Sequence, residues 1–265
     1  MLGSGSGGNA VLVEAAEGRV LVDAGFGVRT LAGRLAAIGV PPESIEACVI
    51  THEHTDHVKG AAAAARRWGW ALHASRGTIA HAPELAGSQV RAFDAGASLA
   101  FSTMDVATVR TPHDAAESVG VTLTARRSGV RAAVCTDLGH VSDGVRALCR
   151  DADILVVESN HDEAMLRAGP YPPVVQARIA GEHGHLANRH AAALIRDSAT
   201  RRLRHVVLAH LSEKCNEPAL ARATAEREVR RSVYRGAVAT AHQREIVGPF
   251  DVAGGVEPRQ YSLAI

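Results

Sequence analysis

A histidine-rich segment directly after one apolar run holds the residues with the clearest capacity for chemistry. Residues 51–57 read THEHTDH, so the imidazoles of His52, His54 and His57 lie close to the Asp56 carboxylate in the chain. Burying such a cluster without a cation is costly, because its polar groups lose their hydration and crowd one another. Imidazole with carboxylate suits zinc or manganese better than calcium or copper. We therefore predict a metal site here rather than four solvated loop residues.

The apolar run at 47–50 predicts a strand that ends where this segment begins. Alternate residues of an extended chain share one face, so we expect His52 and His54 to point to the same side. Asp56 and His57 can then turn toward a second position nearby. Together with ligands from elsewhere in the chain, these four residues would hold two divalent ions.

Three further ligand candidates each lie at the end of another apolar run: His113, Asp137 and His210. A rigid sheet presents the residues at its strand ends to one rim, and functional side chains commonly lie there. Any one of the three alone would more often be an ordinary hydrogen-bonded polar residue. Their joint occurrence with the histidine-rich segment favours one shared metal site.

The spacing of apolar residues predicts the elements that must position these side chains. In the first half we expect helices at 28–38 and 58–68, and strands at 11–14, 20–23, 46–51, 70–73, 89–93, 104–111, 119–126 and 130–136. In the second half we expect strands at 154–157 and 206–209, and helices after 161, after 187 and at 217–232. Short loops predict an antiparallel meander for the strands from 89 to 136. The whole order predicts an α/β fold in which two sheets pack together with helices on both outer faces.

The composition of the chain bounds its class. No linker or block of charge interrupts the sequence, so we expect one domain over residues 1–265. The 29 lysines and arginines balance 28 aspartates and glutamates, which neither demands nor excludes a nucleic-acid partner. Four scattered cysteines favour buried, reduced thiols. Because no apolar stretch reaches membrane-span length and no signal peptide is recognisable, we expect a soluble, cytoplasmic protein.

The glycine-rich loop at residues 3–8 formally matches the dinucleotide pattern G-x-G-x-x-G. A hairpin, with strands at 11–14 and 20–23, follows it instead of the helix that nucleotide binding requires, so we reject that function. Two interpretations stay open. The loop either packs beside the metal site, with backbone amides available to a phosphate, or serves only as a packing turn.

In their order along the chain, the seven ligand candidates resemble those of metallo-β-lactamase-fold hydrolases, and the resemblance spans nearly the whole sequence. More narrowly, the segments at 3–9, 136–140, 158–162, 184–188 and 209–212 resemble the WalJ/YycJ group. The resemblance implies a four-layer αββα sandwich with two mixed sheets. It also implies a phosphodiesterase, because DNA exonuclease activity is attributed to members of that group. Members normally begin with a strand before the glycine-rich loop, whereas only Met1 and Leu2 precede it here. Either the start site is placed too late or the first strand is truncated, and a truncated strand would leave a sheet edge exposed.

The resemblance also implies how the ligands divide between two ions, Zn²⁺ or Mn²⁺. The first ion takes His52, His54 and His113, the second takes Asp56, His57 and His210, and Asp137 bridges them. Two such ions lower the pKa of a bridging water and neutralise charge on the reacting phosphate, so a hydroxide is the expected nucleophile.

We mark Asp56, His161 and His185 as the catalytic candidates. A leaving alkoxide needs a proton, which a histidine can supply. His161 lies in the segment where related ribonucleases carry a proton-donating histidine, and His185 lies in a glycine-flanked turn. The competing interpretations are an exposed residue in the first turn of a helix for His161, and an orienting or loop hydrogen bond for His185.

The favoured function is a metal-dependent phosphodiesterase with DNA as substrate, most specifically a DNA exonuclease. The alternative on the same metals is a small-molecule phosphodiesterase, thioesterase or lactonase. A catalytically silent DNA-binding scaffold is disfavoured because every ligand type is present. The arginines at 201–204 and 222–235 could follow a DNA backbone, but the glutamates between them favour a solvated helix face.

Overall fold

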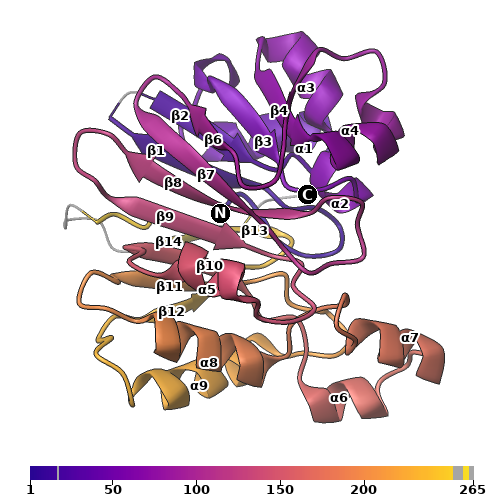
Figure 1. Ribbon diagram of the computed structural model, residues 1–265, viewed down its shortest axis with the longest axis vertical. Coiled ribbons are helices and arrows are strands. Elements are labelled where there is room, and N and C mark those ends of the chain that lie inside the picture. The colour runs from indigo at the N-terminus through magenta and orange to yellow at the C-terminus, as the bar shows by residue number, and fades with distance from the viewer. Residues whose placement is uncertain (17, 253–258, 263–265) are drawn as a thin grey trace.

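Two β-sheets pack face to face in this protein, and helices cover the outer face of each sheet (Figure 1). The computed structural model describes residues 1–16, 18–252 and 259–262. The layer order is helix, sheet, sheet, helix, so the predicted αββα sandwich with two mixed sheets is confirmed.

The first sheet contains five strands, whose order across the sheet follows their order in the chain. They are β1 (Val11–Ala15), β2 (Gly18–Val22), β3 (Ala47–Ile50), β4 (Ala71–Ser75) and β5 (Val90–Phe93). β1 and β2 form the predicted antiparallel hairpin, whereas β2 to β5 pair in parallel. The prediction that the strand at 89–93 opens an antiparallel meander is wrong. β5 joins this sheet beside β4, because an intervening helix provides the crossover that parallel pairing needs.

The second sheet contains seven strands in the order β12-β11-β10-β9-β8-β7-β6. They are β6 (Ser98–Ala100), β7 (Met104–Arg110), β8 (Val119–Ala125), β9 (Arg131–Cys135), β10 (Ile154–Glu158), β11 (His205–Ala209) and β12 (Val238–Thr240). β6 to β9 form an antiparallel meander, and β9 to β12 pair in parallel. A separate hairpin joins β13 (Glu245–Gly248) to β14 (Arg259–Ser262).

The helices divide between the two outer faces. α1 (Val28–Ala37), α3 (Ala61–Trp68) and α4 (Arg76–His81) lie on the side of the first sheet, and α5 (Asp143–Cys149), α8 (Asn188–Ser198) and α9 (Pro218–Val229) lie on the side of the second (Figure 1). The short helices α2 (Thr55–Val58), α6 (Glu163–Ala168) and α7 (Pro173–Ile179) lie in connections. Apolar spacing did not predict α7, and none of its residues is buried. In the part of the chain that the structure describes, no helix is both long and apolar enough to cross a membrane.

Successive apolar side chains of a strand point to opposite faces of the sheet, and this divides the apolar core into layers. In β2, Val20 and Val22 pack between the two sheets, whereas Leu21 packs under the helices of the first sheet. In β10, Val156 packs between the sheets, whereas Leu155 packs under α5 and α8. Neighbouring residues of a strand point to opposite faces, so strands buried on both sides must be apolar throughout. This double burial fixes the strand ends and the side chains that follow them.

The N-terminal residues have backbone partners, while β1 is the edge strand of the first sheet and pairs with β2 alone among the described strands. The Met1 amino group donates to the Val247 carbonyl over 2.9 Å, and the Val247 N–H donates to the Met1 carbonyl over 3.0 Å. The Leu2 N–H in turn donates to the Ala10 carbonyl over 2.9 Å. β13 thus provides the backbone partners of Met1.

Candidate metal centre

All seven predicted ligands lie at one rim of the sandwich, where strands of both sheets end. In the first sheet, β3 leads into His52. In the second sheet, β7, β9 and β11 run parallel to one another and lead into His113, Asp137 and His210. Within each of four groups, the ligand atoms all lie within 4.8 Å of one another. The groups are His52 with His54 and His113, Asp56 with His57 and His210, His52 with His57 and Asp137, and Asp137 with Glu158, His185 and His210. This geometry can hold more than one metal ion.

Three residues at this rim adopt a left-handed backbone although they are not glycine. The φ angles are 62° at Asp23, 59° at Asp137 and 54° at His210. Aspartate and histidine enter this region more readily than most side chains, yet such backbone conformations are strained and concentrate at functional sites. The sharp turns allow each side chain to leave its strand and face the cluster.

Hydrogen bonds to Nδ1 orient four of the imidazoles and leave their Nε2 atoms for the cluster. The pairs are His52 Nδ1 with Thr51 Oγ1 at 3.0 Å, His57 Nδ1 with Asp23 Oδ2 at 2.8 Å, His113 Nδ1 with the Gly184 carbonyl at 3.0 Å, and His210 Nδ1 with Glu158 Oε1 at 3.1 Å. An acceptor on one ring nitrogen fixes the tautomer that presents the other nitrogen to a metal. The imidazole rings are therefore already oriented for metal binding by the protein itself.

Sequence reasoning missed Asp23, which is the buried carboxylate that holds the first part of the cluster. Besides its contact with His57, Asp23 Oδ1 accepts from the Thr51 N–H over 2.8 Å, and Oδ2 accepts from Thr51 Oγ1 over 2.9 Å. It directly follows the apolar strand β2, just as the predicted ligands follow their strands. That position is the signal that could have found it.

We expect Asp23→Asn to weaken metal binding by about ten- to a hundredfold while the protein stays folded, because a partner that orients a ligand contributes on this scale. Asparagine keeps the shape and tolerates the left-handed backbone, but its amide is a weaker acceptor for the His57 N–H. Competition with a metal chelator of known affinity measures the effect. Unchanged affinity in the variant would show that Asp23 does not orient His57.

Glu158 is the second buried carboxylate that the ligand assignment left out. It is 0% exposed at the end of β10, where Oε2 accepts the Leu138 N–H over 2.6 Å. Oε1 lies 2.7 Å from His185 Nδ1 and 3.1 Å from His210 Nδ1. Glu158 therefore connects a predicted catalytic histidine to a predicted metal ligand.

The buried histidines of the cluster have shifted pKa values, which depend on whether a carboxylate lies beside the ring. Burial lowers the pKa of His52 well below its usual value, and the neighbouring His57 lowers it further, so the His52 imidazole is neutral. Burial would also lower the pKa of His57 and His210, but Asp137 and the carboxylates beside each ring raise both values well above normal. The carboxylates thus favour positive charge at the centre, which is the charge that a metal ion brings.

The glycine-rich loop packs against this site. Ser4 Oγ accepts from the His210 N–H over 2.8 Å and donates to Asn9 Oδ1 over 3.0 Å. Asn9 in turn donates from Nδ2 to Asp56 Oδ2 over 3.2 Å, and its backbone N–H donates to the Asp56 carbonyl over 2.8 Å. Of the two interpretations of this loop, the structure supports packing beside the predicted ligands.

The two catalytic histidine candidates differ in their surroundings. His185 lies next to the cluster, with Nδ1 3.6 Å from Asp137 Oδ1 and its ring centroid 5.2 Å from that of His210. His161 is 1% exposed, and its side chain forms no hydrogen bond with any other described residue. The alternative of an exposed helix residue is therefore wrong for His161, which precedes α6 and is enclosed by the residues around it.

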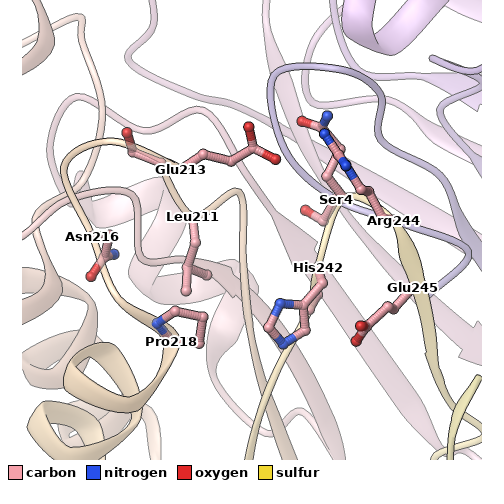
Figure 2. Close-up of a pocket in the computed structure, with 11 residues that line it drawn as sticks. Ser4, Leu211, Glu213, Asn216, Pro218, His242, Arg244 and Glu245 are labelled. Atoms are coloured by element: carbon pink, nitrogen blue, oxygen red, sulfur yellow. The ribbon is translucent and has the colours of Figure 1, made fainter. Parts of the chain in front are cut away.

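A cavity of about 310 Å³ lies near His210 and is lined in part by Leu211 and Ser212, the next two residues of the chain (Figure 2). Ser4 lines it, together with the charged residues Glu213, Arg244 and Glu245. Two carboxylates against one guanidinium make this cavity unfavourable for a phosphate group.

The arginines at 201–204 and 222–235 were considered as contacts for a DNA backbone. Those with described contacts lie away from the metal centre or form ion pairs. Arg202 precedes β11, so it lies at the end of that strand opposite His210, and it pairs with Asp153 over 2.8 Å. On α9, Arg222 lies 4.0 Å from Glu226. These contacts favour the solvated helix face over a path for DNA.

Comparison with known proteins places this geometry among relatives. The model of the β-lactamase superfamily domain matches residues 18–211. Exodeoxyribonuclease WalJ of Streptococcus pneumoniae serotype 2 (strain D39 / NCTC 7466) is 32% identical over 230 residues, which cover 84% of this chain and 85% of that protein. Exodeoxyribonuclease YycJ of Bacillus anthracis is 34% identical over 226 residues, with coverage of 84% and 85%.

Among solved structures, the metallo-β-lactamase fold protein YhfI from Bacillus subtilis superimposes with a TM-score of 0.69. The superposition covers 91% of this chain and 94% of YhfI at 18% identity. It supports the fold alone.

Proposed function

Because this chain belongs to the β-lactamase superfamily and, within it, to the WalJ/YycJ group, we propose that it is a metal-dependent hydrolase that degrades DNA from its ends. The observation that carries the proposal is the convergence of five imidazoles and two carboxylates at one rim, in a chain whose relatives over 84% of its length are named exodeoxyribonucleases.

The fold family binds divalent metal ions, and the residues of this chain fit such ions. His52 is 0% exposed, yet its Nε2 atom has no hydrogen-bond partner among the described residues. A buried polar atom without a partner is rare in folded proteins and is accounted for by a bound ion. We assign two ions, Zn²⁺ or Mn²⁺. Their ligands are His52, His54 and His113 for one, Asp56, His57 and His210 for the other, and Asp137 for both.

When bound, the ions would supply an activated water and offset the negative charge that develops on the phosphate. The protein's own groups provide the proton transfers. Asp56 Oδ2 is held by Asn9 and lies 3.4 Å from His210 Nε2, which keeps the carboxylate directed at the cluster. We assign Asp56 a catalytic role beyond ligation, namely orienting the attacking water.

We assign His185 as the residue that protonates the leaving oxygen of the sugar. Its Nδ1–H donates to Glu158, which fixes the ring. Burial lowers the pKa of His185, but Glu158 raises it above its usual value, so the ring holds a second proton on Nε2 that is available to a substrate. Its side chain is 25% exposed, whereas those of His57, His113 and His210 are at most 4% exposed. Glu158 is held in turn by the Leu138 N–H, so the proton donor stands on a rigid support.

His185→Gln is expected to lower kcat on DNA about a hundredfold with metal content retained, because loss of a general acid typically costs this much. The p-nitrophenyl ester of thymidine monophosphate should lose far less, because its leaving phenolate needs no proton. The exposed neighbour variant His183→Gln is the matched control. Equal losses on both substrates would contradict the role of proton donor.

The proposed function is tested with purified, metal-analysed protein on end-labelled linear duplex DNA, with added manganese or zinc and the Asp56→Ala variant beside it. Stepwise shortening from the ends that disappears in the variant is the expected result. Two bound metal ions without DNA cleavage would overturn the exonuclease assignment and favour a small phosphodiester or ester substrate.

A further inference from the structure

A second cavity, of about 360 Å³, adjoins the metal centre. Its lining comes from α6, α7 and the first residues of α8, and His185 forms part of its wall. Figure 1 shows α6 and α7 beyond the end of the second sheet, and residues of both helices line the cavity. Its volume lies in the range of about 300 to 1,000 Å³ typical of small-ligand sites. The cavity therefore suits one nucleotide rather than a duplex.

The charged groups of this cavity are mainly basic. Arg167, Arg189 and His190 line it with a single carboxylate, Glu163. Arg189 Nε lies 2.8 Å from Glu163 Oε2, so that carboxylate is already balanced. Arg167 forms no ion pair with any residue that the structure describes, which leaves its guanidinium available to a ligand. The cavity near His210 shown in Figure 2 has the opposite excess of charge, with two carboxylates and one guanidinium.

The backbone and the cavity wall add to this preference for an anion. α8 begins at this cavity, because its N-cap Ala187 and the first-turn residues Arg189 and His190 belong to the lining, so the positive end of the helix lies beside the cavity. His161 also lines the cavity, and its Nδ1 is buried without a partner among the described residues. Leu166 and Pro173 provide an apolar surface on the side of α6 and α7. A phosphate joined to an apolar or planar group matches all of these features.

We propose that this cavity binds the terminal nucleotide of the DNA through its phosphate, with Arg167 and Arg189 as the phosphate-binding residues. The inference rests on the proposed exonuclease function and adds to it a site for the nucleotide next to the cleaved bond. His185 separates the cavity from the metal ligands, so a nucleotide held here places its neighbouring phosphodiester at the centre. His161 is a positioning residue for that nucleotide.

Calorimetric titration of the metal-loaded protein with thymidine monophosphate and with thymidine tests the proposal. Arg167→Ala is expected to weaken monophosphate binding about tenfold, the loss typical of one charge-assisted hydrogen bond, and to leave thymidine binding unchanged. Glu163→Gln frees Arg189 and is expected to strengthen monophosphate binding. Arg127→Ala is the matched control, because Arg127 lies in the turn before β9, at the end of the strand opposite Asp137.

Three further outcomes test the proposal. If both Arg167→Ala and Arg189→Ala bind the monophosphate as the unmodified protein does, the phosphate is held by the metal alone and the proposal is overturned. On DNA, the arginine variants should raise KM with kcat largely retained. If the unmodified protein binds the monophosphate through these arginines yet cleaves no DNA, the nucleotide site stands and the exonuclease assignment fails, so the two failures are distinguishable.

Discussion

Asp137→Asn is expected to lose most of its bound metal and to cleave DNA about a thousandfold more slowly, the upper range for removing one group that stabilises transition-state charge. Asp137 lies between the proposed ligand sets, with Oδ2 3.1 Å from His57 Nε2 and Oδ1 3.4 Å from His210 Nδ1. An asparagine keeps one oxygen, but its NH₂ group cannot bind a metal. One substitution therefore disturbs both metal positions.

Elemental analysis of the purified variant and its rate on end-labelled DNA measure this effect. Asparagine tolerates the left-handed backbone at φ 59°, so the fold itself should survive the change. Asp105→Asn is the matched control, because Asp105 lies on β7 and pairs with Arg126 at the surface. A variant that keeps full metal content and activity would contradict the bridging role of Asp137.

Removal of metal by a chelator is expected to lower the melting temperature by about 10 °C. A ligand that binds only the folded state contributes about 4 kcal/mol when its concentration is a thousand times Kd. For a chain of about this size, each kcal/mol shifts Tm by about 2 to 4 °C. The physical origin is burial, since His52 and His57 are each 0% exposed and their ring nitrogens cannot turn to water once the ions are gone.

Thermal unfolding followed by circular dichroism, with and without chelator, provides the measurement. The Asp137→Asn protein is the control, because it should melt at one temperature in both conditions. Restoring zinc or manganese to the chelated protein should return the original transition. Identical melting of the native protein with and without metal would show that the cluster does not couple ion binding to folding.

The nucleotide cavity gives a different role to each of the two histidines that sequence reasoning ranked together. His185 is hydrogen-bonded to Glu158 and lies next to Asp137, whereas the His161 side chain lines the cavity without a hydrogen bond to any residue that the structure describes. Substitution of either would slow the enzyme. Only for the His185 variant should the size of the rate loss depend on the leaving group of the substrate. The basic residues that matter for substrate are then Arg167 and Arg189, and not the arginines near 201–204.

The sequence by itself determined the candidate ligands and most of the elements that carry them. His52, His54, Asp56 and His57 are neighbours in the chain, and the apolar strand before them shows that they emerge from a buried sheet. The same signal, a polar residue after an apolar run, found Asp137. Such patterns are local, because strand periodicity and turn chemistry depend on residues a few positions apart.

Tertiary structure alone decided which distant groups meet and what each one does. Asp23 lies 34 positions from His57, and Glu158 lies 52 positions from His210, yet each pair shares a hydrogen bond. No local pattern encodes these contacts, since they follow from the packing of two sheets and the direction of each strand. β5 shows the same limit: its apolar pattern predicts a strand, but parallel or antiparallel pairing depends on where the connecting chain crosses the sheet.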